Sequence, residues 1–389
     1  MLKREISQIW MMIFLFDLNA NSMKYLYPFL CLFFYSCIQH QTNQPIDITE
    51  TTDTVEVMYA QGFEVNYRNG FTEIITHHFA ENTPFADTVY IVTDSVVKLP
   101  EHALVIQPEK IFFACHSSTH LAFLSALGCV EKVKGLCGMQ YIKGTNYETK
   151  LIETDAIELC LQDQVIPEKI QQTGADLFLM YPFESIGKEK FTGAGIKTFF
   201  IAEYLETDPL ARLEWIKLFG LLTNQVEKAQ EVFDIASKEY LELKREKPDT
   251  AKKFILNLPY GESWFMPSSQ SLLVNLIESS GISYFYPPSG KTENDVHSLE
   301  QVWNDGIIAD YWIIIAGRDA DFSLNDLIEE SPVYSEFKSV KSKQVIFCNT
   351  NTTEYFTTGV IEPHILLKDL LYARGEVSNH QPVYFRLLE

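Results

Sequence analysis

One short pattern occurs in both halves of the chain, and this repeat limits the possible folds more than any other feature of the sequence. The first copy spans residues 167–179 and the second spans residues 299–313. Each copy passes from an acidic residue in a short helical segment, through a turn, to the pair Ala-Asp and an apolar run typical of a buried strand. A helix–turn–strand unit that recurs predicts two lobes of similar α/β construction.

Strands and helices alternate around both copies of the pattern. Ser117 and its neighbours are suited to begin a helix that Gly128 ends. This alternation is typical of βαβ units, so the predicted fold class is α/β, with two Rossmann-like lobes at residues 106–206 and 248–389 that each contain a parallel sheet. Apolar runs indicate the strands of these sheets at residues 110–114, 133–136, 176–180, 197–201, 254–258, 311–316 and 344–347.

Residues 54–105 have a different pattern, and we expect a small β segment there. Residues 63–67 and 71–76 alternate apolar and polar side chains, as half-buried strands do. The pair Asn69-Gly70 lies between them and favours a two-residue hairpin turn.

A long helical pattern at residues 207–247 separates the two lobes. Asp208 is a suitable N-cap and Pro209 suits the first helical position. Apolar residues recur at every third or fourth position from Leu213 to Leu243, which predicts one continuous, rigid helix between the lobes. About 35 residues at ~1.5 Å each would extend roughly 50 Å. The alternative is a long helix within a single domain.

The N-terminal residues resemble a targeting segment rather than a folded domain. Lys24 precedes an apolar run at residues 25–35, as in a secretory signal. We therefore expect a lipoprotein leader at residues 1–37, in which Cys37 is acylated, followed by a polar tether at residues 38–53. The residues just before Cys37 depart from the usual lipoprotein motif, so a plain signal peptide or a short membrane anchor is the alternative.

The overall charge and the motifs narrow the function classes. The 389 residues carry a formal net charge of −21, and no basic cluster interrupts this acidity, which argues against a nucleic-acid partner. The patterns GxSxG, HExxH and GxxxxGK are absent from the sequence, which weighs against an enzyme.

The cysteines do not form a recognisable ligand or disulfide pattern. All seven lack CxxC and zinc-ligand spacing, so no metal site is expected. Small apolar cysteines are common in cores, which favours buried free thiols over a disulfide framework. This interpretation applies to the cysteines beyond the leader, Cys115, Cys129, Cys137, Cys160 and Cys348.

Together these features resemble the substrate-binding proteins of ABC importers that carry iron chelates and cobalamin. The resemblance covers roughly residues 105–389, although that family has Pro-Asp where this chain has Ala-Asp in both copies of the pattern. It implies a class III, chelatase-like fold and a periplasmic protein without a cofactor or enzymatic activity, whose transported ligand is a metal chelate or a corrinoid. Beyond the repeat, it rests on residues 117–123, 136–141, 208–217 and 264–267.

The same resemblance implies how the partner complex is recognised. In that family a glutamate at the start of the repeated helix, one in each lobe, docks on arginines of the permease; the matching residues are Glu168 and Glu300. An acid in a first helical turn is favoured by the helix dipole, and an exposed pair can bind arginines of a partner. Ordinary N-terminal helix acids are the alternative. The expected partners are an ABC permease with its ATPase, the ligand, and a membrane through the lipid anchor, with the protein as a monomer.

The ligand is expected in a cleft between the lobes, because open α/β sheets bind ligands beyond the carboxyl ends of their strands. The candidate residues are rich in aromatic side chains and poor in charge, which favours a broad, neutral or weakly charged chelate. His116 or Met139 could also bind a metal centre directly, although a hydrogen-bonded histidine and a core methionine are the ordinary interpretations. The candidates are His116, Ser117, Ser118, Thr119, Met139, Gln140, Tyr141, Tyr181 and Phe183 in the first lobe, and Tyr260, Trp264, Phe265, Arg318, Asn349, Tyr355 and Phe356 in the second.

Two other functions fit the same fold class. A surface lipoprotein that hands its ligand to an outer-membrane receptor would keep the cleft without needing the two glutamates. A chelatase-like enzyme acting on a metal tetrapyrrole would share the two-lobed fold, because fold alone does not define function. The export signal argues against the enzyme.

Overall fold

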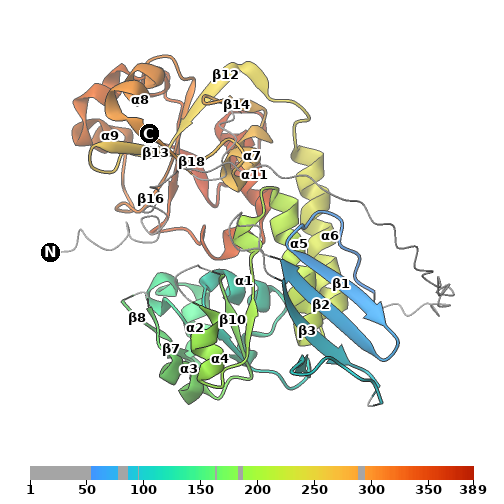
Figure 1. The fold of residues 1–389 in the computed structure, drawn as a ribbon. Coiled ribbons are helices and arrows are strands. Elements are labelled where there is room, and N and C mark those ends of the chain that lie inside the picture. Colours follow the sequence, from blue (N-terminus) through green and yellow to red (C-terminus); the bar gives the residue numbers. More distant parts are fainter. Residues whose placement is uncertain (1–53, 78–85, 95, 163, 183–186, 288–293) are drawn as a thin grey trace, which may run out of the picture. The chain divides into compact units, whose positions relative to one another are not determined.

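The computed structural model describes residues 54–389, apart from 78–85, 95, 163, 183–186 and 288–293 (Figure 1). Residues 51–389 form one compact unit. The predicted leader at 1–37 with Cys37, and the tether at 38–53, lie outside the described residues. Among the helices that the structure describes, none combines the length and the apolar character that crossing a membrane requires.

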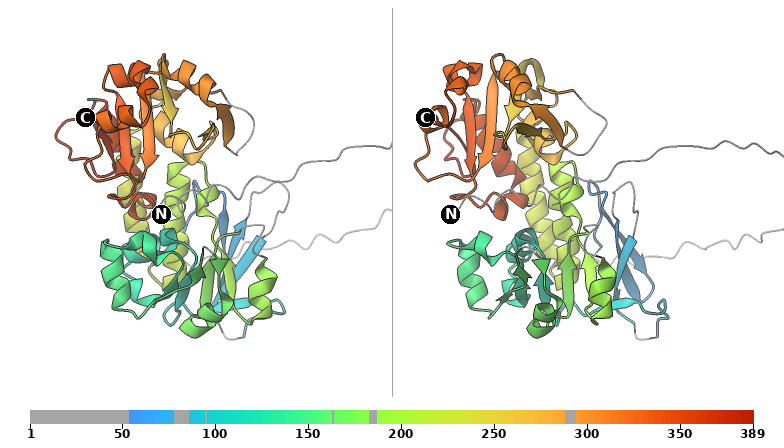
Figure 2. Two further views of the ribbon diagram at one scale, coloured as in Figure 1. Left: turned by 90° about the vertical axis from the view of Figure 1, so that its left-hand side faces the viewer. Right: turned by 60° about the vertical axis from the view of Figure 1, so that its left-hand side comes forward.

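The first lobe contains a five-stranded parallel sheet in the order β11-β10-β5-β6-β7. Its strands and helices follow the predicted alternation, and Figure 2 shows helices beside the sheet. The bounds are β5 Phe113–Cys115, α1 Ser118–Ala126, β6 Val133–Leu136, α2 Asn146–Ile152, β7 Ile157–Glu158, α3 Pro167–Thr173, β10 Leu177–Met180, α4 Lys188–Gly193 and β11 Thr198–Phe200.

The second lobe contains a five-stranded sheet in the order β14-β12-β16-β17-β18, of which β18 alone runs antiparallel to its neighbour. The predicted bounds of β16 agree with the structure. The bounds are β12 Asp249–Leu256, β13 Ser263–Met266, α7 Leu272–Glu278, β14 Ile282–Tyr284, β15 Asp295–Ser298, α8 Leu299–Gly306, β16 Tyr311–Ala316, α9 Leu324–Glu330, α10 Lys338–Lys341, β17 Val345–Asn349, α11 Pro363–Ala373 and β18 Phe385–Leu387.

The two lobes share one topology, which confirms the α/β class with parallel sheets. The order β11-β10-β5-β6 in the first lobe matches β17-β16-β12-β14 in the second. The repeated Ala-Asp has the same role in both lobes. Asp176 accepts a hydrogen bond from the Phe112 N–H (2.9 Å), and Asp310 accepts one from the Lys253 N–H (2.9 Å). Each aspartate thereby ties the strand that follows it to the first strand of its lobe.

The prediction of one continuous bridging helix is wrong. Helix α5 (Pro209–Thr223) ends at Asn224, which adopts a left-handed conformation (φ 57°), and α6 (Val226–Leu243) runs back beside it (Figure 1). The pairing is antiparallel, since the Lys217 ammonium lies 4.2 Å from the centre of the Phe233 ring. The apolar spacing continues across the turn because both helices are buried against each other and the lobes, so periodicity alone did not reveal the reversal.

The α5–α6 hairpin still connects the lobes, because it packs against elements of both. On α5, Phe219 stacks on Phe123 of the first lobe, with ring centres 4.8 Å apart. On α6, Glu239 accepts a hydrogen bond from Lys368 of α11 in the second lobe (2.7 Å). Helix α6 has 18 residues, about 27 Å in length, roughly half of the predicted rod.

The predicted β segment is a four-stranded sheet in the order β1-β2-β3-β4, and the turn Asn69-Gly70 joins β1 to β2 as expected. Gly70 has a positive φ of 86°, the conformation that this turn requires. Buried carboxylates hold the segment before the sheet, because Glu214 accepts backbone hydrogen bonds from Met58, Tyr59 and Ala60. The bounds are β1 Phe63–Arg68, β2 Phe71–His77, β3 Ala86–Val92 and β4 Leu104–Ile106.

The expectation that all the cysteines beyond the leader are free is wrong for one pair. Cys137 and Cys160 form a disulfide, with Cα atoms 5.0 Å apart, whereas Cys115, Cys129 and Cys348 are buried free thiols. A separation of 23 residues carries no local signal, and only the fold brings these two sulfurs together.

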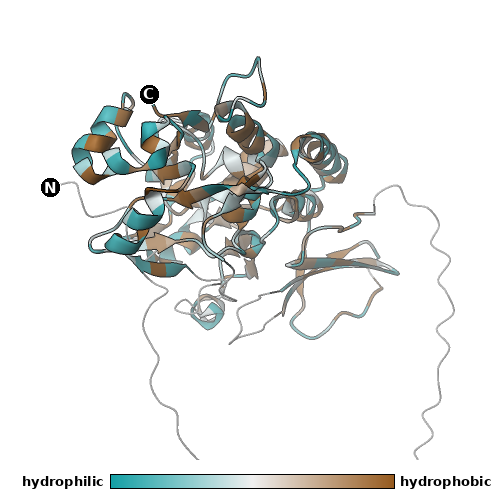
Figure 3. Ribbon diagram, turned by 90° about the horizontal axis from the view of Figure 1, so that it is seen from above, coloured by the Kyte–Doolittle hydropathy of each residue, from teal (hydrophilic) through white to brown (hydrophobic). Residues whose placement is uncertain are grey.

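Helices at the surface have polar and apolar sides, which Figure 3 shows as alternating colours. Helix α8 is an example, with Val302 buried and Glu300 exposed. Helix α5 differs, because nearly all of its residues are buried, as a helix packed on several sides must be.

Candidate functional site

The carboxyl ends of β5 and β10 meet at a buried polar network in the first lobe. The Thr119 hydroxyl lies 2.6 Å from the Tyr181 hydroxyl, and both donate to Oε1 of Glu203 at 2.8 Å. Arg212 on α5 forms an ion pair with the same oxygen at 3.5 Å. Glu203 is fully buried, and its second oxygen has no hydrogen-bond partner among the described residues. The network thus offers one unused carboxylate oxygen close to the predicted ligand contacts Thr119 and Tyr181.

Two histidines border this network, and burial keeps both neutral. Burial lowers the pKa of His116 to about 4, and burial together with the nearby His116 lowers the pKa of His120 well below its usual value. Nδ1 of His116 accepts a hydrogen bond from the Tyr181 N–H (3.3 Å), while the His120 ring packs edge-on against Tyr181. Burial also raises the pKa of Tyr181 well above its usual value. The two histidines and Tyr181 are therefore uncharged beside Glu203.

A second strand end contributes the loop that contains Met139, Gln140 and Tyr141. These residues form the 3-10 turn η2 (Met139–Ile142), which begins after Gly138 in a left-handed conformation (φ 81°). Glu158 accepts hydrogen bonds from the N–H groups of Gly138 (3.0 Å) and Met139 (2.8 Å). Tyr141 is 48% exposed, so the loop presents an accessible aromatic ring. Ser117 caps α1 and Ser118 begins it, as predicted.

The predicted residues of the second lobe divide into surface and core. Tyr260 and Phe356 are exposed, and Phe265 and Tyr355 are half-buried. Trp264 is fully buried and donates its indole N–H to the Leu256 carbonyl (2.9 Å), so it belongs to the core rather than to a ligand-accessible surface. The strand pattern could not show which side of β13 faces inward.

Two other predicted contacts have structural partners. Asn349 is buried, and its side-chain oxygen accepts a hydrogen bond from the Arg318 N–H (3.1 Å). The Arg318 guanidinium donates to both carboxylate oxygens of Glu330, at 2.8 and 3.1 Å. Arg318 also borders a hollow of about 560 Å³ whose other charged lining residues are acidic. The positive charge of this candidate cleft residue is therefore already balanced by Glu330. Phe183 lies outside the described residues.

Residues of the two lobes meet close to these strand ends. The Tyr147 hydroxyl on α2 lies 2.9 Å from the Thr358 hydroxyl of the 3-10 turn η5 (Thr358–Val360) in the second lobe. Asn275 on α7 donates to the Thr207 carbonyl before α5 (2.8 Å). Direct hydrogen bonds therefore link the second lobe to α2 of the first lobe and to the segment before α5.

The two predicted docking acids occupy the same helical position. Glu168 is the second residue of α3, after Pro167, and Glu300 is the second residue of α8, after Leu299. Both are exposed. Within the part of the chain that the structure describes, neither carboxylate has a hydrogen bond or an ion pair. Each is therefore available to a partner.

Glu203 and Arg212 are the residues of this site that the sequence analysis missed. Glu203 follows β11, so counting the end of that outer strand with the others would have included it. Arg212 lies one turn into α5, and no local pattern distinguishes it from a solvated helix residue.

Comparisons of the sequence with known proteins find a related lipoprotein. No protein-family model matches the chain. An uncharacterized lipoprotein of Methanocaldococcus jannaschii is 25% identical over 268 residues, which cover 65% of this chain and 62% of that protein. The chain therefore spans less than two thirds of the length of this relative.

Solved structures that resemble the chain are substrate-binding proteins of ABC transporters and periplasmic binding proteins. A periplasmic binding protein from Veillonella parvula matches 78% of this chain and 98% of its own (TM-score 0.57, 15% identity). The periplasmic heme binding protein HutB of Vibrio cholerae matches 67% and 99% (TM-score 0.53, 13% identity). The siderophore-binding protein FhuD of Vibrio cholerae, solved with Fe³⁺-Desferal, matches 67% and 98% (TM-score 0.50, 14% identity). The chain has the TroA-like, class III fold of these binding proteins.

Proposed function

We propose that the protein is the solute-binding lipoprotein of an ABC importer, which captures a metal chelate between its two lobes and delivers it to the permease. The observation that carries this proposal is the repeated lobe plan with an exposed, unpaired glutamate at the same helical position in each lobe, Glu168 and Glu300. Two equivalent acids on two similar lobes suit a partner with two equivalent basic sites.

The strand ends favour a neutral or weakly charged chelate as the ligand. His116 and His120 are neutral, Arg318 is paired with Glu330, and the accessible side chains include Tyr141, Tyr260 and Phe356. Aromatic faces bind broad, partly apolar ligands well. An iron siderophore, haem and a corrinoid all fit this description, and the similar structures include one protein that binds haem and one that binds a ferric siderophore.

The proposed location is the periplasmic side of a membrane, with Cys37 as the lipid anchor and the protein as a monomer without a cofactor. The lipoprotein relative and the signal-like N-terminal residues support this location. The structural relatives are binding proteins, which supports transport rather than catalysis.

The ligand is identified by the absorption spectrum and mass of the molecule that copurifies with the protein. Titration of the purified protein with haem, cobalamin and a ferric hydroxamate, followed by tryptophan fluorescence, measures affinity for each. We expect tight binding of one of the three. Turnover of a tetrapyrrole, with no stable binding of any of them, would support the chelatase alternative and contradict the proposal.

Permease docking is tested by reversing the two exposed acids. We expect Glu168→Arg with Glu300→Arg to abolish uptake while ligand affinity stays unchanged, because both carboxylates lie on helix surfaces. A matched control is Glu189→Arg with Glu329→Arg, which reverses two other exposed helix acids. If uptake survives the first pair, or falls equally with the control, the docking role is wrong and the scavenging lipoprotein becomes the better interpretation.

A further inference from the structure

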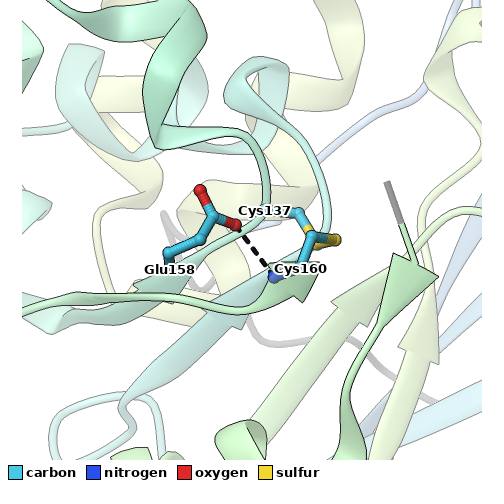
Figure 4. A group of neighbouring side chains, drawn as sticks. All are labelled: Cys137, Glu158 and Cys160. Carbon is cyan, nitrogen blue, oxygen red and sulfur yellow. Dashed lines mark hydrogen bonds between the residues drawn. A yellow bond between two sulfur atoms is a disulfide. The ribbon is translucent and has the colours of Figure 1, made fainter. Parts of the chain in front are cut away.

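Three potential metal ligands converge at the ends of β6 and β7 in the first lobe, and none of them belongs to the Thr119–Glu203 network. Cys137 follows β6, Glu158 ends β7, and Cys160 begins the short strand β8 (Cys160–Leu161). One ligand atom from each of the three lies within 4.8 Å of the other two (Figure 4). Cys137 is buried and the other two are half-buried, so the group can be reached from solvent on one side.

Backbone hydrogen bonds hold this group together independently of the disulfide. The Glu158 carboxylate accepts from the N–H groups of Gly138 (3.0 Å), Met139 (2.8 Å) and Cys160 (2.8 Å). Because Gly138 adjoins Cys137, these bonds bind both cysteine-bearing segments to one carboxylate. A carboxylate has about four acceptor positions, and three are used here, so one remains for a cation.

We propose that Cys137, Cys160 and Glu158 bind one thiophilic divalent cation, such as Zn²⁺, when the disulfide is reduced. Two thiolates and a carboxylate are ordinary zinc ligands, and they leave the fourth tetrahedral position to water. The site goes beyond the proposed transport function and does not depend on it.

The chemical steps balance with a phosphine as reductant. A trialkylphosphine attacks the S–S bond, and water then supplies the oxygen of the phosphine oxide and the two protons of the thiols. Zn²⁺ then displaces the two thiol protons as it binds Cys137 and Cys160. Exchange with a small-molecule disulfide restores the Cys137–Cys160 bond, releases two small-molecule thiols and removes both sulfur ligands, so binding of the cation depends on the redox state.

The three other cysteines among the described residues do not offer an equivalent site. Cys115, Cys129 and Cys348 are buried, and burial raises the pKa of each thiol. The thiolate is the form that binds metals, so these three are poor ligands.

The test titrates Zn²⁺ alone into the whole purified protein, after phosphine reduction, in competition with a chromophoric chelator. We expect one Zn²⁺ per reduced chain and none for the oxidised chain. Cys160→Ser should weaken binding by more than about tenfold, the smallest usual effect of losing even an outer-shell partner. Cd²⁺ should produce thiolate-to-metal absorption in the reduced wild type but not in the Cys137→Ser, Cys160→Ser double variant.

Two further variants distinguish the loss of a metal ligand from a loss of folding. Cys348→Ala removes a buried thiol elsewhere and should leave Zn²⁺ affinity unchanged, while Glu158→Gln keeps an acceptor for the backbone but weakens the metal ligand. Far-ultraviolet circular dichroism establishes that each reduced variant is folded. The proposal is overturned if the reduced wild type binds no Zn²⁺, or if the folded Cys160→Ser variant binds it as tightly as the wild type.

Discussion

The two lobes share a strand order but differ in the side chains that follow the strands. In both lobes an aspartate ties the repeated strand to its neighbour, and an exposed glutamate occupies the second position of the preceding helix. In the first lobe, the residues that follow the strands form a buried polar network, include two neutral histidines and contribute to a disulfide. In the second lobe, the residues that follow the strands include exposed aromatic side chains and Arg318, whose charge Glu330 neutralises.

This difference shows which features the scaffold requires and which the ligand requires. The strand-tying aspartates recur because any parallel sheet with this crossover must join the same two strands. The side chains beyond the strands differ, which fits the proposed function, in which each lobe would contact a different side of the ligand. The predictions below test the contrast between the two lobes.

The largest effect is expected where the added β sheet joins α5. Glu214 is fully buried and pairs with the Lys217 ammonium at 2.8 Å while it accepts three backbone hydrogen bonds. Glu214→Leu should lower the free energy of unfolding by about 3–5 kcal/mol, because it leaves a buried cation and buried N–H groups unpaired. Urea denaturation measures this loss. The exposed pair Lys228–Glu231 is the control, and Glu231→Ala should cost less than about 1 kcal/mol.

Removal of the disulfide should have the next largest effect, and it acts on the first lobe alone. Closing a loop with a separation of 23 residues stabilises a protein by about 3 kcal/mol in the chain-entropy description. Cys137→Ala with Cys160→Ala should lower the free energy of unfolding by that amount, and a reductant should then have no further effect. A variant as stable as the wild type would show that hydrogen bonding by Glu158 alone makes the Met139 loop rigid.

The lowered pKa of the buried histidines predicts that the stability of the protein depends on pH, through the first lobe. Below the ordinary histidine pKa of 6.5 the unfolded chain binds protons, whereas folded His116 binds one only near pH 4. Since the unfolded state then binds more protons, stability should fall as the pH falls from about 6.5 towards 4. His116→Gln should remove on the order of 2 kcal/mol of this fall. Urea midpoints at about pH 7 and about pH 5 measure it; an unchanged pH dependence would contradict the assignment.

The smallest effects should come from the two strand-tying aspartates. Asp310 is 12% exposed at its side chain and also pairs with Lys338 at 2.9 Å, whereas Asp176 is exposed. Asp310→Asn should therefore cost about 1–2 kcal/mol and Asp176→Asn less than about 1 kcal/mol. Thermal unfolding of the two single variants compares them directly. Equal losses would show that the ion pair with Lys338 contributes nothing.

Local signals predicted many individual elements of the fold. The pair Asn69-Gly70 marked the turn between β1 and β2, and the uninterrupted apolar run at residues 311–316 marked β16. The prediction of one continuous bridging helix failed because a single residue, Asn224, reverses the chain direction without disturbing the apolar spacing. For the site, the structure places the candidates Thr119 and Tyr181 in one polar network, but the same reasoning included Trp264, whose burial no local pattern reveals.

The amino-acid sequence by itself determined the α/β class, the repeated lobe plan and the two exposed glutamates, because each depends on neighbouring residues and on short periodicities. The tertiary structure alone decided the α5–α6 hairpin, the disulfide between Cys137 and Cys160, and the pairing of Arg318 with Glu330. These features join residues that are distant in sequence or depend on a single backbone conformation. Their energies arise only when the packed lobes bring the partners within contact distance.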